Sequence, residues 1–264
     1  LPPFRGGGGT LRALAMSIRC DVVLSPSETL PEADCWLVID ILRATTTMCA
    51  YFDGGGKRLY PAESIEEAFT LRDRLAREGN APLLMGERNS LPPPGFDLGN
   101  SPLELLAAAP ATRPDAVMAT TNGTRALLKA ASSGAKVYPV CARNANATLR
   151  AALGAGERIG ILCAGLYGRP AMDDAACAGL LAEQLLGQGA VLDDGAKMAL
   201  SVWQAGMRNL SALLGASVHG GRLLSLGFAP DMAYAAEIDA SNSVLVLSEV
   251  KELPCIVPGN TPAA

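Results

Sequence analysis

Short apolar segments recur along the chain and alternate with longer segments whose apolar residues lie at helical spacing. The short segments are continuously apolar and rich in β-branched residues, which is typical of strands covered on both faces. They predict strands at 21–24, 35–40, 58–61, 83–86, 116–119, 136–140, 158–163 and 244–247. Because helical segments separate most of these strands, the pattern predicts an α/β fold with largely parallel or mixed sheets flanked by helices.

The helical segments are marked by their ends as well as by their spacing. One begins after Ser64, which is placed to cap it, with Glu67 at the position of a capping box. The other predicted helices cover 102–108, 124–131, 144–153, 174–186 and 193–214. The last of them carries an apolar stripe, which indicates a core position or a contact between two subunits, so a homodimer is a hypothesis.

The distribution of elements predicts two lobes. The chain becomes mainly helical after Asp174, which favours an N-terminal α/β lobe at 16–145 and a C-terminal α/β lobe at 146–253. Residues 1–15 match no element and are interpreted as a disordered or artificially added tail, since Met16 begins the segment that leads into the first strand. The proline-rich residues 254–264 are expected to form a loose tail.

The composition narrows the class of protein. Of the 264 residues 49% are hydrophobic and 18% are charged, and the formal net charge is −4. The negative net charge and the lack of a basic stripe argue against nucleic acid as a partner. No apolar run reaches the roughly 18 residues of a membrane span. Seven cysteines without a Cys-x-x-Cys pair indicate buried free thiols in the cytoplasm. The single histidine, His219, excludes sites that need two.

Polar residues directly follow several predicted strands, and this is where open α/β sheets bind ligands. The clearest case is 120–126, Thr-Thr-Asn-Gly-Thr-Arg-Ala, which joins a strand to a helix. N–H groups at a helix start, small hydroxyl groups and a guanidinium group together suit an anion. The candidate substrate-binding residues here are Thr121, Asn122, Gly123, Thr124 and Arg125. Taken alone, the segment fits an ordinary capped turn better.

A second polar segment, 38–47, ends a buried strand on Asp40 and continues through Arg43 and three threonines, the first of them Thr45, into a helix. A carboxylate at a strand end is a common Mg²⁺ ligand, because this hard cation prefers oxygen. A buried ion pair between Asp40 and Arg43 explains the same pattern equally well.

A third segment, 86–102, places Glu87 directly behind a strand. Its prolines and glycines indicate a shaped loop, as functional loops often are. The loop closes with Asn100, Ser101 and Pro102, which is typical of a helix start.

Two later segments complete the set. A polar loop after the strand at 158–163 leads to Asp173 and Asp174 at a helix start, where acidic residues cap the helix or take part in metal binding and acid–base chemistry. The segment 217–232 contains His219, Arg222 and Asp231. We favour a hydrogen-bonded structural role for His219 over a catalytic one.

These five segments, in this order, resemble the 2-phosphosulfolactate phosphatase (ComB) family. The resemblance covers roughly residues 18–250, and its most specific motifs are Gly-Asn-Ser-Pro at 99–102 and the segment 120–126. It implies a Mg²⁺-dependent acid phosphatase that hydrolyses 2-phosphosulfolactate to sulfolactate and phosphate, a step of coenzyme M biosynthesis. The partner it implies is a small phosphorylated sulfonic or carboxylic acid.

The residues are compatible with this chemistry. A phosphosulfolactate carries three anionic groups, which several donor-rich turns would hold, and Mg²⁺ would offset charge on the phosphoryl oxygens. We predict metal binding by Asp40, Glu87 and Asp174, which together with Arg43 form the predicted catalytic set. The predicted substrate-binding residues are Thr45, Asn100, Ser101, Thr121, Asn122, Gly123, Thr124 and Arg125. Whether a covalent phospho-intermediate forms stays open.

Alternatives to a metal-dependent phosphatase stay open at this point. Cys163 and Arg169 have the Cys-x5-Arg spacing of cysteine-dependent phosphatases, in which the pKa of the thiol is lowered. A non-catalytic protein that binds small anions would use the same turns. An aspartyl-phosphate mechanism of the haloacid dehalogenase type does not fit, because Leu42 stands where a second Asp is needed. Tyr167 and Met172 are interpreted as packing residues.

Overall fold

The computed structural model describes residues 17–79 and 81–260. Its strands form one ten-stranded sheet in the order β4-β5-β3-β10-β9-β6-β2-β7-β1-β8. The strands are β1 Arg19–Val23, β2 Cys35–Ile39, β3 Arg58–Ala62, β4 Leu83–Gly86, β5 Asp115–Ala119, β6 Lys136–Val140, β7 Arg158–Cys163, β8 Val191–Leu192, β9 Leu245–Val250 and β10 Leu253–Pro258. The α/β class is confirmed, and the predicted strands differ from the observed ones mainly at their ends.

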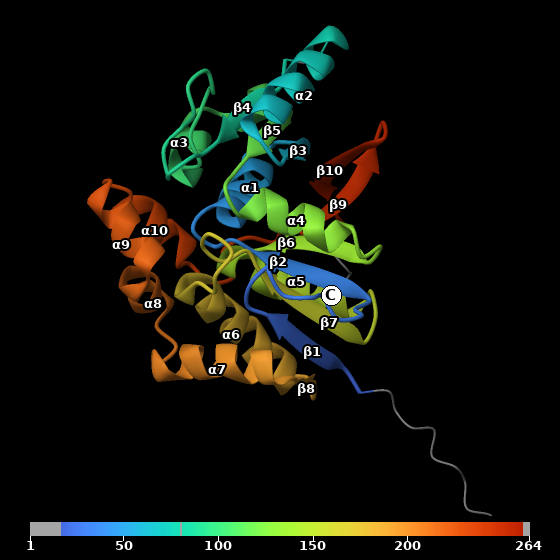
Figure 1. Ribbon diagram of the computed structural model, residues 1–264, viewed down its shortest axis with the longest axis vertical. Helices are drawn as coiled ribbons and strands as arrows, with labels where there is room; N and C mark the ends of the chain where they lie inside the picture. Colours follow the sequence, from blue (N-terminus) through green and yellow to red (C-terminus); the bar gives the residue numbers. More distant parts are fainter. Residues whose placement is uncertain (1–16, 80, 261–264) are drawn as a thin grey trace, which may run out of the picture.

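The sheet has two parallel parts that are joined by an antiparallel hairpin (Figure 1). Strands β3, β4 and β5 pair in parallel, as do β6, β2, β7, β1 and β8. Between them lies the joining hairpin β9–β10, in which β10 pairs with β3 and β9 pairs with β6. The two parallel parts therefore meet without sharing a strand pair.

The boundary predicted near residue 145 does not divide this sheet. Strand β7 comes after that residue but lies between β1 and β2, which come before it. The smaller parallel part is instead an internal segment, 58–119. The prediction of a loose tail from residue 254 is wrong for its first part, because Leu253–Pro258 forms β10. The remaining predicted tail residues 1–15 and 261–264 lie outside the described residues.

Helices cover both faces of the sheet, and the last three helices lie together at its left side in Figure 1. Their bounds are α1 Ala44–Asp53, α2 Ile65–Arg77, α3 Pro102–Ala107, α4 Gly123–Ala131, α5 Ala145–Leu153, α6 Met172–Gly187, α7 Asp194–Ala205, α8 Leu210–Ala216, α9 Val218–Ser225 and α10 Ala229–Ala235. Ser64 caps α2 as predicted, by accepting a hydrogen bond from the N–H of Glu67 (3.0 Å). The single helix predicted at 193–214 is wrong, because a turn with positive φ at Met207 and Arg208 separates α7 from α8.

Strand β2 shows why the central strands are continuously apolar. Cys35, Leu37 and Ile39 pack into one core with α5 and α6, whereas Trp36 and Val38 pack into another core with α4. Both faces of the strand are therefore buried, as expected for a parallel sheet covered by helices. All seven cysteines are buried and free, which confirms the prediction of buried thiols.

Within the described part of the chain, no helix combines the length and the apolar character needed to cross a membrane.

Candidate active site

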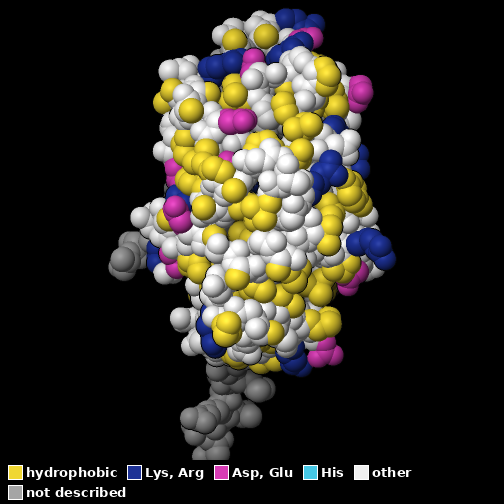
Figure 2. Space-filling model, turned by 90° about the vertical axis from the view of Figure 1, so that its left-hand side faces the viewer, with side chains coloured by type: hydrophobic (Ala, Val, Ile, Leu, Met, Phe, Trp, Pro, Cys, Tyr) yellow, Lys and Arg dark blue, Asp and Glu magenta, His cyan; other side chains and the backbone are white. Residues whose placement is uncertain are grey.

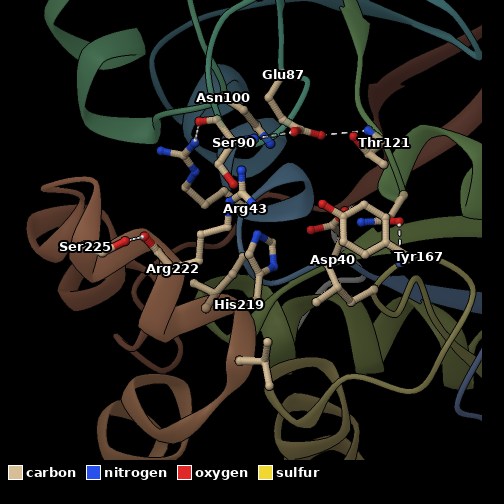
Figure 3. A pocket seen from close by; sticks show the side chains of 14 residues that line it. Asp40, Arg43, Glu87, Ser90, Asn100, Thr121, Tyr167, His219, Arg222 and Ser225 are labelled. Atoms are coloured by element: carbon tan, nitrogen blue, oxygen red, sulfur yellow. Dashed lines mark hydrogen bonds between the residues drawn. The ribbon is translucent and has the colours of Figure 1, made fainter.

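The main pocket lies at the carboxyl ends of parallel strands from both parts of the sheet. It has a volume of about 320 Å³. Segments that follow β2, β4, β5 and β7 form its wall, and α9 closes it from the opposite side (Figure 3). The lining residues are Asp40, Leu42, Arg43, Glu87, Ser90, Asn100, Thr121, Asn122, Leu166, Tyr167, Val218, His219, Arg222 and Ser225. This is the place where the topology of an open α/β sheet predicts a ligand site.

Asp40 comes directly after β2 and is almost fully buried, with 7% of its surface exposed. The N–H of Ala44, in the first turn of α1, donates to its Oδ1 (3.2 Å). Burial raises the pKa of this carboxyl group to about 6, although His219 and the Ala44 N–H act in the opposite direction. The start of α4 packs against the same group, because a Cβ atom at Gly123 would lie 2.6 Å from Oδ2 of Asp40.

Glu87 lies across the pocket, directly after β4. The N–H of Thr121 donates to its Oε1 (2.7 Å) and the N–H of Ser90 donates to its Oε2 (2.9 Å). The first of these bonds is visible in Figure 3. The carboxylate thereby ties together the turns that follow β4 and β5, and each oxygen retains a second lone pair for a ligand.

His219 projects from the first turn of α9 towards Asp40 and Arg43 (Figure 3). Its Nδ1 lies 3.5 Å from Oδ2 of Asp173, which is 2% exposed at the start of α6. Burial lowers the pKa of His219, but the contact with Asp173 and the negative charges of Asp40 and Glu87 outweigh burial. The pKa of the imidazole therefore lies above its ordinary value. The carboxylates around His219 thus favour the protonated form of the imidazole.

Two arginines line the pocket in different ways. Arg43 is 3% exposed, donates to Oδ2 of Asp231 (2.8 Å) and to the carbonyl oxygen of Ser90 (2.9 Å), and lies over the ring of Phe228. The ion pair that the sequence suggested for Arg43 therefore exists, but its partner is Asp231 and not Asp40. Arg222 is exposed, lines the pocket and donates to the carbonyl oxygen of Asn89 (2.9 Å), a bond that uses only one of its five donors.

Comparison with known proteins gives this pocket its context. A family model described as 2-phosphosulpholactate phosphatase matches residues 22–250. A "probable 2-phosphosulfolactate phosphatase" of Deinococcus radiodurans is 40% identical over 92% of this chain and 95% of its own length. A relative of the same printed name from Thermus thermophilus is 41% identical over 88% of this chain and 94% of its own length.

The chain belongs to the 2-phosphosulfolactate phosphatase family. The predicted family is thereby confirmed. Phosphatases of this kind are phosphoric monoester hydrolases, so the family membership makes this chain an enzyme of that class.

The pocket contains six of the residues that the sequence predicted for the site: Asp40, Arg43, Glu87, Asn100, Thr121 and Asn122. Asn100 is 3% exposed and its Oδ1 has no hydrogen-bond partner among the described residues. Since a buried acceptor without a partner is costly, this amide oxygen is a candidate to contact a hydrogen-bond donor or a cation bound in the pocket.

Other predicted residues support the pocket from outside. Asp174 accepts the N–H groups of Ile41 (3.0 Å) and Gly165 (2.8 Å), so it connects the turns after β2 and β7. Burial, followed by the charges of Asp173 and Asp40, raises its pKa well above the ordinary value. These contacts give Asp174 a positioning role, and its side chain does not line the pocket. The predicted metal contact of Asp174 stays a prediction.

Three of the predicted substrate-binding residues have buried hydroxyl groups that lie outside the pocket. Thr45 is 1% exposed and donates to the carbonyl oxygen of Asp40 (2.9 Å). Ser101 donates to Oδ1 of Asp231 (2.7 Å) and caps α3, and Thr124 is fully buried at the start of α4. None of these three side chains lines the pocket.

The remaining predicted anion clamp, Arg125, does not line the main pocket. It is exposed and lines a neighbouring cavity together with Lys129 and Ser27, and this cavity shares Thr121, Asn122 and Tyr167 with the main pocket. A helical residue two positions after Gly123 points away from the surface that faces Asp40.

The cysteine-dependent alternative does not fit the structure. Cys163 is fully buried in β7, and burial raises the pKa of its thiol well above the ordinary value. A nucleophilic cysteine needs the opposite, an accessible thiol with a lowered pKa. Arg169 is exposed and does not line the main pocket.

The pocket offers carboxylate ligands to a metal ion but not a complete set of protein ligands. Among residues 17–79 and 81–260, no group of three or more His, Cys, Asp or Glu side chains is arranged to hold a metal. Mg²⁺ does not require such a set, because it is usually bound by one or two carboxylates together with water and substrate phosphate. Asp40 and Glu87, which both line the pocket, fit that pattern.

The local sequence pattern gives little indication of the α9 side of the pocket. It favours a structural role for His219 and assigns no role to Arg222, yet both side chains line the pocket. It also predicts packing for Tyr167, which lines the pocket with 60% of its surface exposed. The spacing of His219 and Arg222 is the sequence feature that indicates this side of the pocket. They are three residues apart, so in a helix both side chains project from one face.

Proposed function

We propose that this enzyme hydrolyses 2-phosphosulfolactate to sulfolactate and phosphate, with Mg²⁺ as its cofactor. The observation that supports this most strongly is the juxtaposition of His219 and Arg222 with Asp40 and Glu87 in one pocket of about 320 Å³. Cationic donors and carboxylates in the same small space suit a polyanionic substrate that arrives with a divalent cation. The printed names of the relatives agree with that substrate.

The donors of the pocket bind the anionic groups of the substrate. Arg222 offers a guanidinium group whose planar donors match phosphate, sulfonate or carboxylate oxygens. Asn122 precedes α4 and lines the pocket. Because the first N–H groups of a helix carry partial positive charge, the start of α4 adds to the attraction for an anion.

His219 protonates the leaving oxygen. When water attacks phosphorus, the bond between phosphorus and the bridging oxygen breaks and the oxygen of sulfolactate needs a proton. An imidazolium whose pKa is raised and whose Nδ1 is oriented by Asp173 supplies that proton from Nε2. The proton released from the attacking water restores the imidazolium.

Asp40 and Glu87 are the residues that would hold Mg²⁺. The ion would neutralise charge on the phosphoryl oxygens. Burial raises the pKa of Asp40, so protons and Mg²⁺ would compete for its carboxylate, and at limiting Mg²⁺ the activity should fall as the pH is lowered.

The test is phosphate release from 2-phosphosulfolactate with Mg²⁺ and with excess EDTA. We expect turnover that EDTA abolishes and Mg²⁺ restores. Turnover that persists in EDTA would refute the proposed cofactor, and binding without turnover under every divalent metal would select the non-catalytic anion-binding alternative.

His219→Gln tests the proposed proton donor. We expect kcat to fall by about 10²–10⁴-fold, with a small change in KM, and the alkaline limb of the pH profile to disappear. Arg222→Gln is the comparison, since loss of a binding group should raise KM instead. A His219→Gln enzyme with an unchanged alkaline limb would contradict the assigned role.

A further inference from the structure

A second, larger cleft opens directly beside the main pocket. Its volume is about 540 Å³. The two spaces share Leu166, Tyr167, Val218 and His219, so these four residues form the border between them. A group bound beside His219 therefore lies next to both spaces.

The two spaces differ in their chemistry. The second cleft is bordered by the loop that precedes α6 and by the junction of α8 with α9. Its unshared apolar lining consists of Pro170, Ala171, Met172 and Ala216. Among the described residues that line this cleft, Asp173 and Arg169 are the charged ones apart from the shared histidine, and the carboxylate of Asp173 lies against that histidine.

Apolar side chains around this cleft are unusually exposed. The exposed fraction is 82% for Val218, 60% for Tyr167 and 37% for Met172. Figure 2 shows the face of the molecule that carries α8, α9 and α10, where hydrophobic side chains lie in several groups among charged and other polar ones. An apolar ligand group that covers these side chains would displace water from them, which lowers the free energy of binding.

The wall between the spaces has a defined shape. The backbone of Gly165, Tyr167 and Gly168 has positive φ, and the N–H of Tyr167 donates to Oδ1 of Asn122 (3.3 Å). Leu166 and Arg169 exchange backbone hydrogen bonds across the turn. The loop therefore holds the aromatic ring at the border between the polar and the apolar space.

A small trianionic substrate does not explain such a cleft. Phosphate, sulfonate and carboxylate groups all favour the polar pocket, and each would lose hydration against an apolar wall. Small-molecule sites are mostly apolar with a few polar groups that fix orientation, and the two spaces together have that composition.

We propose that the second cleft binds an apolar substituent of the substrate. The enzyme would then also hydrolyse phosphate monoesters of 2-hydroxy acids that carry a branched aliphatic or aromatic side chain. This inference rests on the proposed function, because it places the leaving oxygen at His219 and the phosphate in the main pocket. From that position the carbon chain of the hydroxy acid passes the border residues into the cleft.

The experiment measures kcat/KM for a series of phosphorylated 2-hydroxy acids: 2-phosphosulfolactate, 2-phospholactate, the phosphate ester of 2-hydroxy-4-methylpentanoate and that of 3-phenyllactate. We expect the two larger apolar substrates to exceed 2-phospholactate by about tenfold or more, as buried apolar groups usually do. A kcat/KM that stays flat or falls with apolar size would overturn the inference.

Ala216→Trp is the matching variant. Ala216 is exposed at the end of α8 and lines only the second cleft, so a larger side chain fills the cleft without entering the core. We expect the preference for apolar substrates to vanish while the kcat/KM for 2-phosphosulfolactate stays unchanged. Ala212→Trp is the control, since Ala212 is exposed on the same helix and lines neither space.

The outcomes separate this inference from the proposed function. Turnover of 2-phosphosulfolactate without an apolar preference overturns only the role of the cleft. An apolar preference that Ala216→Trp leaves intact also overturns it, because the substituent must then lie elsewhere. Absence of phosphate release from every member of the series, with Mg²⁺ present, overturns both.

Discussion

Asp40 should destabilise the folded enzyme when it is ionised, so Asp40→Asn should raise the stability while it removes the activity. Burial raises the pKa of this carboxyl group from 3.8 to about 6. Below pH 3.8 the group is neutral in both the folded and the unfolded state, and no cost arises. Above that value the unfolded state loses its proton first, and each pH unit up to about 6 adds about 1.4 kcal/mol to the cost of folding. The free energy of unfolding of Asp40→Asn should therefore exceed that of the wild type by about 3 kcal/mol at neutral pH.

Urea unfolding in the presence of EDTA, followed by far-UV circular dichroism at about pH 4 and at about pH 7.5, measures this difference. The pH-dependent part is the decisive quantity, because a change in hydrogen bonding would contribute equally at both values. Asp194→Asn, at an exposed carboxylate in the first turn of α7, is the control and should show no comparable increase. If the advantage of Asp40→Asn does not grow between the two pH values, the buried carboxylate is not the source of the destabilisation.

Three further changes test other parts of the structure. Asp231→Ala should lower the free energy of unfolding by about 3–5 kcal/mol, because it leaves the guanidinium group of Arg43 buried without its anionic partner; a loss below about 1 kcal/mol in urea unfolding would show that Arg43 finds another partner. Cys163→Ala should retain kcat for 2-phosphosulfolactate, and the wild type should resist iodoacetamide, since the thiol is fully buried; loss of turnover in folded protein would restore the cysteine mechanism. Gly123→Ala should reduce kcat/KM by tenfold or more, because the new Cβ would lie 2.6 Å from Oδ2 of Asp40; unchanged kinetics would mean that α4 can shift without consequence.

Local sequence patterns predict the parts of the site that follow directly from strand ends. Asp40, Glu87 and Thr121 each come directly after a buried strand or one residue later, and parallel strands bring their carboxyl ends to one edge. The α/β class follows from the same alternation. The pattern does not determine the order of the strands in the sheet. The joining hairpin lies between the two parallel parts, although its strands come last among the described residues.

Long-range partners are the second part that the sequence leaves undetermined. Arg43 pairs with Asp231, which lies 188 positions away, and nothing local distinguishes that partner from the nearer Asp40. The acidic pair at 173–174 illustrates the same difficulty at short range. Adjacent helical residues point about 100° apart, so one carboxylate meets His219 while the other accepts backbone N–H groups of two turns.

The position of the joining hairpin also has a consequence for biosynthesis. During translation, all strands of both parallel parts leave the ribosome before residues 245–258 do. Until then the two parts carry exposed strand edges at β3 and β6, and such edges pair readily with other chains. Premature termination shortly before residue 245 should therefore give an aggregating product rather than a slightly shortened enzyme. A protein fused after residue 258 would be attached next to β10, which is a central strand of the sheet.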